Sequence, residues 1–204
     1  MHLKRLAVAL FPAAAVAVAV GCFSDPVYPG NQVMGTFRFQ AKLDAARTTC
    51  DAGSRDFAQL DDAGSFFFEG TFSRDTDAGT GFFTVQGFSR DAGYTGQSVS
   101  STHRAIARRD SCGTGCEDSE IEEAMNVMLL SDSQARNVAR DCKRLDGGVP
   151  EGDIPAPTEN GYDVSLACGT LTDVFLPSKS GSASCKCNPS TCTTVYTVSG
   201  DRID

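Results

Sequence analysis

The 204-residue chain contains no tryptophan and only two histidines, and these absences narrow the functions that it can have. Loss of an N-terminal leader containing His2 would leave His103 as the sole imidazole for a Ser–His–Asp or Cys–His mechanism. The chain has no Gly-x-Ser-x-Gly elbow, phosphate-binding glycine loop or dinucleotide fingerprint. It also lacks an obvious aromatic platform for stacking a sugar. The sequence therefore gives no catalytic signal and predicts no catalytic residue.

Cys-x-x-Cys is also absent, which excludes c-type haem attachment and a thioredoxin-like redox motif. The zinc patterns want such knuckles, so Cys112-Gly-Thr-Gly-Cys116 and Cys185-Lys-Cys187 favour disulfides over metal in an exported protein. Asp-Ala-Gly triplets begin at four aspartates, and a calcium loop would need further carboxylates at fixed spacing. We expect the triplets to be turns between strands, and we predict neither metal nor cofactor. The triplets begin at Asp51, Asp62, Asp77 and Asp91.

Long hydrophobic runs are limited to one near the start of the chain. Two basic residues, Lys4 and Arg5, precede fifteen uncharged residues at 6–20, and Cys22 follows Gly21. The run is too short to span a bilayer comfortably and is typical of a secretory signal. Its end resembles the lipobox of bacterial lipoproteins, and this resemblance implies that residues 1–21 are removed and that Cys22 is lipidated. The alternative is an ordinary signal cut within 13–19, which would leave Cys22 as a free thiol.

The number of cysteines supports the lipid anchor. The chain has nine cysteines, and an exported domain normally pairs its thiols, so Cys22 as the anchor leaves an even eight. The glycines between Cys112 and Cys116 favour one short bridge, and a proline-containing turn favours Cys187–Cys192. The lipoprotein resemblance also implies release to the outer membrane, because Phe23 rather than Asp follows the anchor. The eight cysteines expected to pair are Cys50, Cys112, Cys116, Cys142, Cys168, Cys185, Cys187 and Cys192.

The charge of the mature chain limits its partners. Without Lys4 and Arg5 the chain has 16 basic and 26 acidic residues, a net charge of −10. Such a surface repels nucleic acid and anionic headgroups, so we expect attachment to the membrane through acyl chains alone. Two prolines make residues 22–31 a short tether, and residues 32–204 are long enough for one domain.

Alternating patterns predict a mainly β domain. Residues 33–43 alternate apolar and polar side chains, and 65–74 and 80–90 are rich in phenylalanine. Residues 97–108 alternate weakly, and 162–168 and 192–199 are expected to close the sheet. We predict a single antiparallel barrel or sandwich, stapled by disulfides, with one or two short helices.

Residues 119–142 allow two interpretations. Apolar positions from Ile121 to Leu129 follow helical spacing, and Ser119 with Glu122 and Ser131 with Gln134 form capping-box patterns. These features favour helix throughout the segment. The alternative is a strand through Leu130 that leads to a short helix from Asp132.

One further pattern is similar to the lipocalin-like barrels. Gly35-Thr36-Phe37 opens the first predicted strand and Arg202 follows the last one, where those barrels have Gly-x-Trp beneath an arginine. The resemblance implies a carrier of small apolar ligands, and phenylalanines on both strand faces would suit it. The absence of catalytic motifs favours instead a non-enzymatic, lipid-anchored envelope protein of structural or partner-binding type. A hydrolase built on His103 is a third, weaker interpretation.

Overall fold

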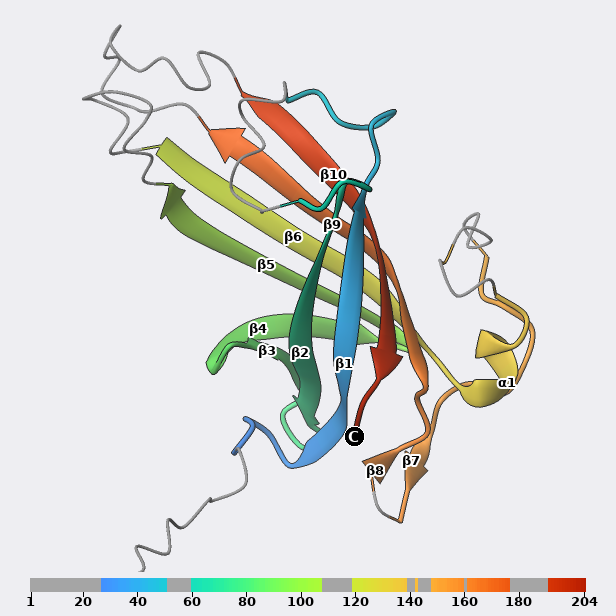
Figure 1. Cartoon of the computed structure of the whole chain (residues 1–204). Helices are drawn as coiled ribbons and strands as arrows, with labels where there is room; N and C mark the ends of the chain where they lie inside the picture. Colours follow the sequence, from blue (N-terminus) through green and yellow to red (C-terminus); the bar gives the residue numbers. More distant parts are fainter. Residues whose placement is uncertain are drawn as a thin grey trace, which may run out of the picture.

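The computed structural model describes residues 27–50, 60–107, 119–138, 142, 148–159, 161–176 and 191–204. Within these ranges eight strands form a closed antiparallel barrel in the order β1-β10-β9-β6-β5-β4-β3-β2 (Figure 1). The mainly β domain predicted from the sequence is confirmed, and its architecture is the barrel rather than the sandwich. The barrel strands are β1 (Gln32–Leu43), β2 (Ser65–Asp75), β3 (Thr80–Val85), β4 (Phe88–Thr95), β5 (Ser98–Ala107), β6 (Ser119–Leu130), β9 (Leu166–Leu176) and β10 (Cys192–Arg202).

Strands that follow one another in the chain are mostly neighbours in the barrel. Between β6 and β9 the chain adds the helix α1 (Asp132–Ala135) and the hairpin of β7 (Pro157–Thr158) and β8 (Gly161–Tyr162). The helix lies outside the barrel, beyond the end of β6 (Figure 1). β1 and β10 pair from Phe37↔Arg202 to Leu43↔Tyr196 and so close the sheet on itself. Closure removes the exposed edges at which open sheets aggregate.

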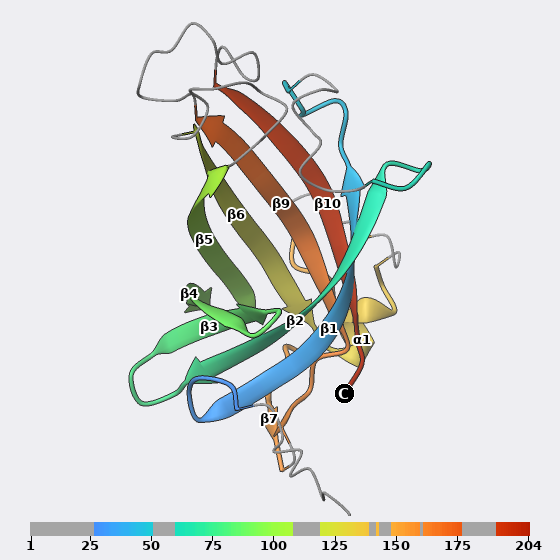
Figure 2. The same cartoon turned by 60° about the vertical axis from the view of Figure 1, so that its left-hand side comes forward.

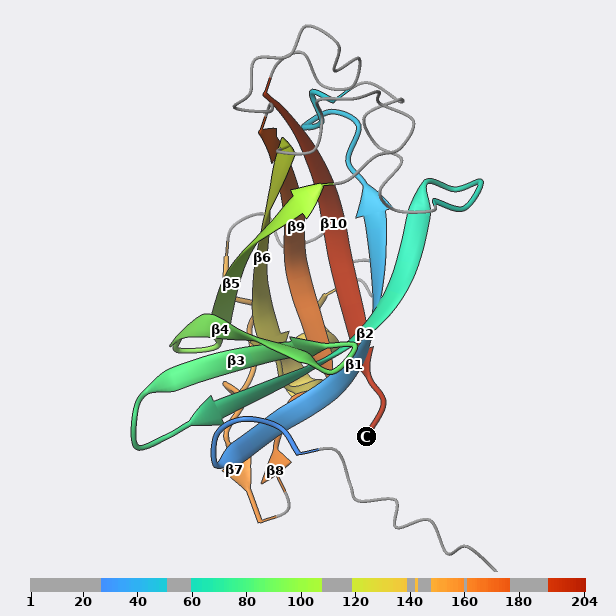
Figure 3. The ribbon, with the colours of Figure 1, turned by 90° about the vertical axis from the view of Figure 1, so that its left-hand side faces the viewer.

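The barrel is uneven along its length. β3 and β4 are short and lie across its lower part, whereas β5, β6, β9 and β10 extend well above them (Figures 2 and 3). A two-residue turn joins β3 to β4, and both of its residues, Gln86 and Gly87, have positive φ angles of 50° and 81°. This backbone matches the strand twist and favours glycine at the second position.

Two of the predicted Asp-Ala-Gly turns are confirmed. The Oδ1 atom of Asp61 accepts hydrogen bonds from the backbone N–H groups of Ala63 and Ser65, and the loop containing Asp77 is capped in the same way by Asp75. The prediction is wrong for the triplet at Asp91, which lies inside β4. Its ladder to β5 and the burial of Ala92 stabilise the extended backbone there. The triplet at Asp51 lies outside the described residues.

The helix predicted over 119–142 is wrong for most of the segment. Residues 119–130 form β6, which pairs with β5 on one side and β9 on the other. Met125, Val127 and Leu129 are buried at every second position, so the same apolar residues also satisfy a strand, and two long ladders override the helical spacing. Only the second capping box is confirmed: Gln134 N donates to Ser131 Oγ at the start of α1. The described residues contain no helix long and apolar enough to cross a membrane.

The strand predicted at 162–168 is also corrected. β8 ends at Tyr162 and β9 begins at Leu166. Between them the N–H of Val164 donates to the carbonyl of Tyr162, a tight turn that interrupts the extended chain. The last strand matches the prediction in position but continues to Arg202.

Two disulfides are present among the described cysteines. Cys50 is bonded to Cys192 and Cys142 to Cys168. The predicted pair Cys187–Cys192 is therefore wrong, because the chain after Thr48 runs beside β10 and brings a partner from far away in the sequence. The predicted pair Cys112–Cys116 lies outside the described residues, as do Cys185 and the lipidation residue Cys22.

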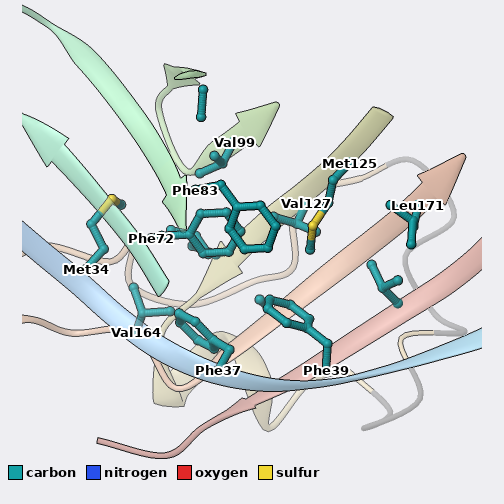
Figure 4. Close-up of a cluster of buried hydrophobic side chains, with 14 of the residues drawn as sticks. Met34, Phe37, Phe39, Phe72, Phe83, Val99, Met125, Val127, Val164 and Leu171 are labelled. Carbon is teal, nitrogen blue, oxygen red and sulfur yellow. The ribbon is translucent and has the colours of Figure 1, made fainter. Parts of the chain in front are cut away.

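Phenylalanine rings fill the barrel beside β1, β2 and β3 (Figure 4). Phe39 is fully buried, and the centroids of its ring and the Phe68 ring are 4.9 Å apart. Phe72 and Phe83 stack at 4.6 Å. We call this part of the interior the aromatic half, and it consists of Phe37, Phe39, Phe68, Phe72 and Phe83.

Candidate functional site

A row of polar side chains crosses the barrel interior away from the aromatic half. His103, Glu123, Asp173 and Thr194 are direct neighbours in the ladders that join β5, β6, β9 and β10. Directly paired residues of antiparallel strands project to the same face of the sheet. The face is the interior, because the row lies two residues along each strand from buried, inward-facing positions such as Met125. We call these four residues the polar row.

Arg90 of β4 reaches this row from the neighbouring part of the wall. Its guanidinium forms an ion pair with the carboxylate of Glu123. The two side chains are 22% and 31% exposed, so solvent reaches this side of the row. One arginine is therefore committed to one of the two carboxylates.

Asp173 has no comparable partner. Its Oδ1 atom is buried and makes no hydrogen bond. Burial, and next the nearby negative charge of Glu123, raise the pKa of the Asp173 carboxyl to about 7, and Arg90 only partly opposes this shift. The carboxyl thus changes its charge near neutral pH.

Thr194, the neighbour of Asp173 on β10, also has an unsatisfied polar atom. The side chain is completely buried, and its hydroxyl oxygen has no hydrogen-bond partner. Apolar side chains flank the row, with Leu171 and Phe175 buried two residues from Asp173 on either side. Each buried polar group without a partner costs about 1–3 kcal/mol. Two such atoms side by side form a polar position inside an apolar wall.

The candidate nucleophile and base considered from the sequence do not form a catalytic arrangement. His103 is exposed and lies opposite Glu123. Ser101 lies on the same strand face, but its hydroxyl donates to the backbone carbonyl of Asp91 at 3.0 Å. Among the described residues no three histidine, cysteine or carboxylate side chains are grouped to hold a metal ion.

The end of the barrel beyond the aromatic half is sealed by a stacked arginine. The guanidinium of Arg74 lies 5.2 Å from the ring centroid of Tyr94 and 5.0 Å from that of Tyr162. The two phenol hydroxyls are 2.9 Å apart, and burial raises the pKa of Tyr94, so the ring stays neutral. Arg74 also donates to the side-chain oxygen of Gln32. Every polar group named here has a partner, which is typical of a structural plug.

The two motif residues that resemble lipocalin-like barrels meet at this sealed end. Phe37 and Arg202 are directly paired across β1 and β10. A side chain at Gly35 would contact both, because a Cβ there would lie 3.2 Å from Arg202 Nε and from the Phe37 ring. The guanidinium of Arg202 donates to the backbone carbonyls of Tyr162 and Val164. Arg202 thereby holds the β8–β9 segment against the barrel.

Sequence reasoning missed the residues of the polar row other than His103. Asp173 follows Leu171 and precedes Phe175, which are both apolar residues of the same strand parity. That parity was the available signal, because a carboxylate at an inward position between apolar residues is unusual. Comparison with known proteins finds no match to this chain among protein-family models, curated proteins or solved structures.

Proposed function

We propose that this protein is a non-catalytic, lipid-anchored binding protein of the cell envelope whose barrel holds a small, largely apolar ligand. The observation that carries the proposal is the contrast inside one closed barrel. One end is packed and sealed by satisfied side chains, whereas the polar row leaves buried acceptors without partners. Ligand sites combine apolar walls with a few convergent polar groups in this way.

The anchor and the barrel fit one arrangement. β1 begins at Gln32, ten residues after Cys22, so a short tether separates the proposed lipid from the barrel. At about 3.3 Å per extended residue, ten residues reach about 33 Å. The barrel would therefore work close to the membrane, which we propose is the outer membrane.

The meeting of Phe37 and Arg202 supports the carrier interpretation. In the barrels that the motif resembles, an arginine covers an aromatic residue at the end opposite the ligand. In this protein Arg202 and Phe37 lie at the sealed end, and the polar row lies toward the other end. The likeness supports a ligand position near the polar row.

Binding of an envelope protein is the second candidate, and exposed aromatic side chains favour it. Phe67 on β2 is 61% exposed and Phe88 on β4 is 76% exposed. Exposed phenylalanines are common anchors in protein interfaces. Crosslinking in intact cells tests this role: a partner captured from Phe67 or Phe88 positions, and lost in the alanine variants, would support it.

Native mass spectrometry of the full chain, processed in a bacterial host and released gently from the membrane, tests the carrier role. We expect a mass for lipidated Cys22 as the first residue, and an additional noncovalent adduct of a small molecule. An unmodified Cys22 would contradict the anchor. A ligand-free mass after incubation with a total envelope extract would contradict the carrier role.

A further inference from the structure

We infer that the polar row recognises an ammonium group, so that the ligand is a small amine with an apolar or aromatic body. This inference rests on the proposed function and adds the chemistry of the ligand. Asp173 and Thr194 supply the two contacts, and Glu123 supplies charge from the neighbouring strand. A fatty acid, the obvious cargo of an apolar barrel near a membrane, is disfavoured by the same residues.

The first argument is the balance of charge. Arg90 is the cation paired with the row, and it is already engaged by Glu123. Ionised Asp173 therefore leaves one negative charge in excess in a largely buried position. A buried charge needs a partner, and a cationic ligand supplies it. A carboxylate ligand would add a second unpaired negative charge.

The second argument is the supply of hydrogen bonds. Asp173 Oδ1 and Thr194 Oγ1 are both buried, both unpartnered and on directly paired residues. An ionised carboxylate only accepts, and a hydroxyl oxygen accepts as well. An ammonium carries three donors and satisfies both atoms at once, whereas an alcohol donates only one hydrogen bond.

The third argument is the wall around the two atoms. Leu171 and Phe175 lie on either side of Asp173 along β9, and Met125 and Tyr196 are the ladder neighbours of Leu171. All four side chains are nearly or fully buried, or line the interior. The carbon atoms of a small amine would therefore contact thioether, aliphatic and aromatic groups. The wall selects for an apolar body and the row for its charged end.

Three probes of matched size separate the possibilities. 2-Phenylethylamine, 2-phenylethanol and phenylacetate share a phenyl ring and differ in their ammonium, hydroxyl and carboxylate groups. We would measure their binding by calorimetry to the full, lipidated chain in nanodiscs. We expect the amine to bind at least tenfold more tightly than the alcohol, and phenylacetate to bind most weakly.

Two variants and a control assign the effect to the row. Asp173→Asn keeps the shape of the side chain and removes its charge, and we expect it to abolish the preference for the amine. Thr194→Val removes one acceptor, and we expect it to weaken the amine several-fold while it leaves 2-phenylethanol less affected. Asp91→Asn removes an exposed carboxylate from the opposite face of β4, beside Arg90, and should keep wild-type binding.

The pH dependence gives an independent readout. Glu123, Arg90 and His103 are the charged or titratable groups that face Asp173 from β6, β4 and β5. Amine binding should strengthen as the pH rises from 6 to 8 and Asp173 ionises, and this rise should vanish in Asp173→Asn. A loss of His103→Ala alone that reproduced the change would contradict the assignment to Asp173.

The outcomes also distinguish this inference from the proposed function. Equal or tighter binding of phenylacetate, or an unchanged amine preference in Asp173→Asn, would overturn the ammonium site. If none of the probes binds but the native protein carries a non-amine ligand, the carrier role stands and the ammonium site is refuted. If no probe binds and no ligand is found in the native protein, both are refuted.

Discussion

The two halves of the barrel interior use the same strands for opposite purposes. In the aromatic half the rings of Phe37, Phe39, Phe72 and Phe83 contact one another, and glycines make room for them. A Cβ at Gly200 would lie 2.5 Å from the Phe39 ring. In the polar row, Asp173 and Thr194 keep buried atoms without partners. Alternating strands thus build a core where the inward side chains match, and a candidate site where they do not.

The largest expected effect is on the aromatic half. Phe39→Ala should lower the free energy of unfolding by about 3–5 kcal/mol, because it leaves a cavity among four neighbouring rings. Denaturant titration followed by far-ultraviolet circular dichroism would measure it. Phe67→Ala, at an exposed position of the neighbouring strand, is the matched control and should change stability by less than about 0.5 kcal/mol. Equal losses in both variants would mean that the rings do not form the stabilising core.

The next effect concerns the Cys50–Cys192 disulfide, which ties the end of β1 to β10. The two cysteines are 142 residues apart, and cross-links that close long loops restrict the unfolded chain most. Replacing both cysteines by alanine should cost about 3–4 kcal/mol. The same change at Cys142 and Cys168, which are 26 residues apart, should cost less. The reverse order in parallel denaturant titrations would argue against a dominant effect on the unfolded chain.

A smaller effect comes from the titration of Asp173. Its pKa is about 7 in the folded protein, compared with about 3.9 in an unfolded chain, so the folded state binds more protons between these values. Stability should therefore fall as the pH rises from 4 to 7, and then level off. Relative to the wild type, Asp173→Asn should gain about 2 kcal/mol between pH 4 and pH 8. Unfolding curves with the same difference at both pH values would contradict a buried, raised carboxyl.

The smallest effect is expected at the sealed end. Tyr162→Phe removes the hydroxyl that bonds to Tyr94 but keeps the ring beneath Arg74, so it should cost about 1 kcal/mol. Because Tyr162 is remote from the polar row, binding of 2-phenylethylamine should stay unchanged. A large loss of binding with a small loss of stability would show that the two halves are coupled.

The sequence predicted those parts of the fold that depend on local patterns. The alternation in 33–43 was sufficient to place β1, and glycine with aspartate marked most turns. Residues 119–130 could not be assigned locally, because Met125 and Leu129 fit both helical and strand spacing and the two neighbouring ladders decide between them. Cys50–Cys192 depends on a contact across 142 residues, which no short spacing records.

The candidate site was less visible in the sequence for the same reason. Asp173 and Thr194 become neighbours only through the pairing of β9 with β10, and Arg90 reaches them from β4. In an acidic chain one further aspartate does not stand out. Its inward parity within 166–176 was the only local indication, and that register is set by the closed barrel.

The most direct test of the account is the pKa of the Asp173 carboxyl, measured by carbon-13 NMR with and without saturating 2-phenylethylamine. In the free protein we expect a value of about 7. Bound ammonium should lower it toward the usual range of aspartate, because a ligand that prefers the ionised form must shift the titration reciprocally. A free value near 4, or a value that the amine leaves unchanged, would contradict the account.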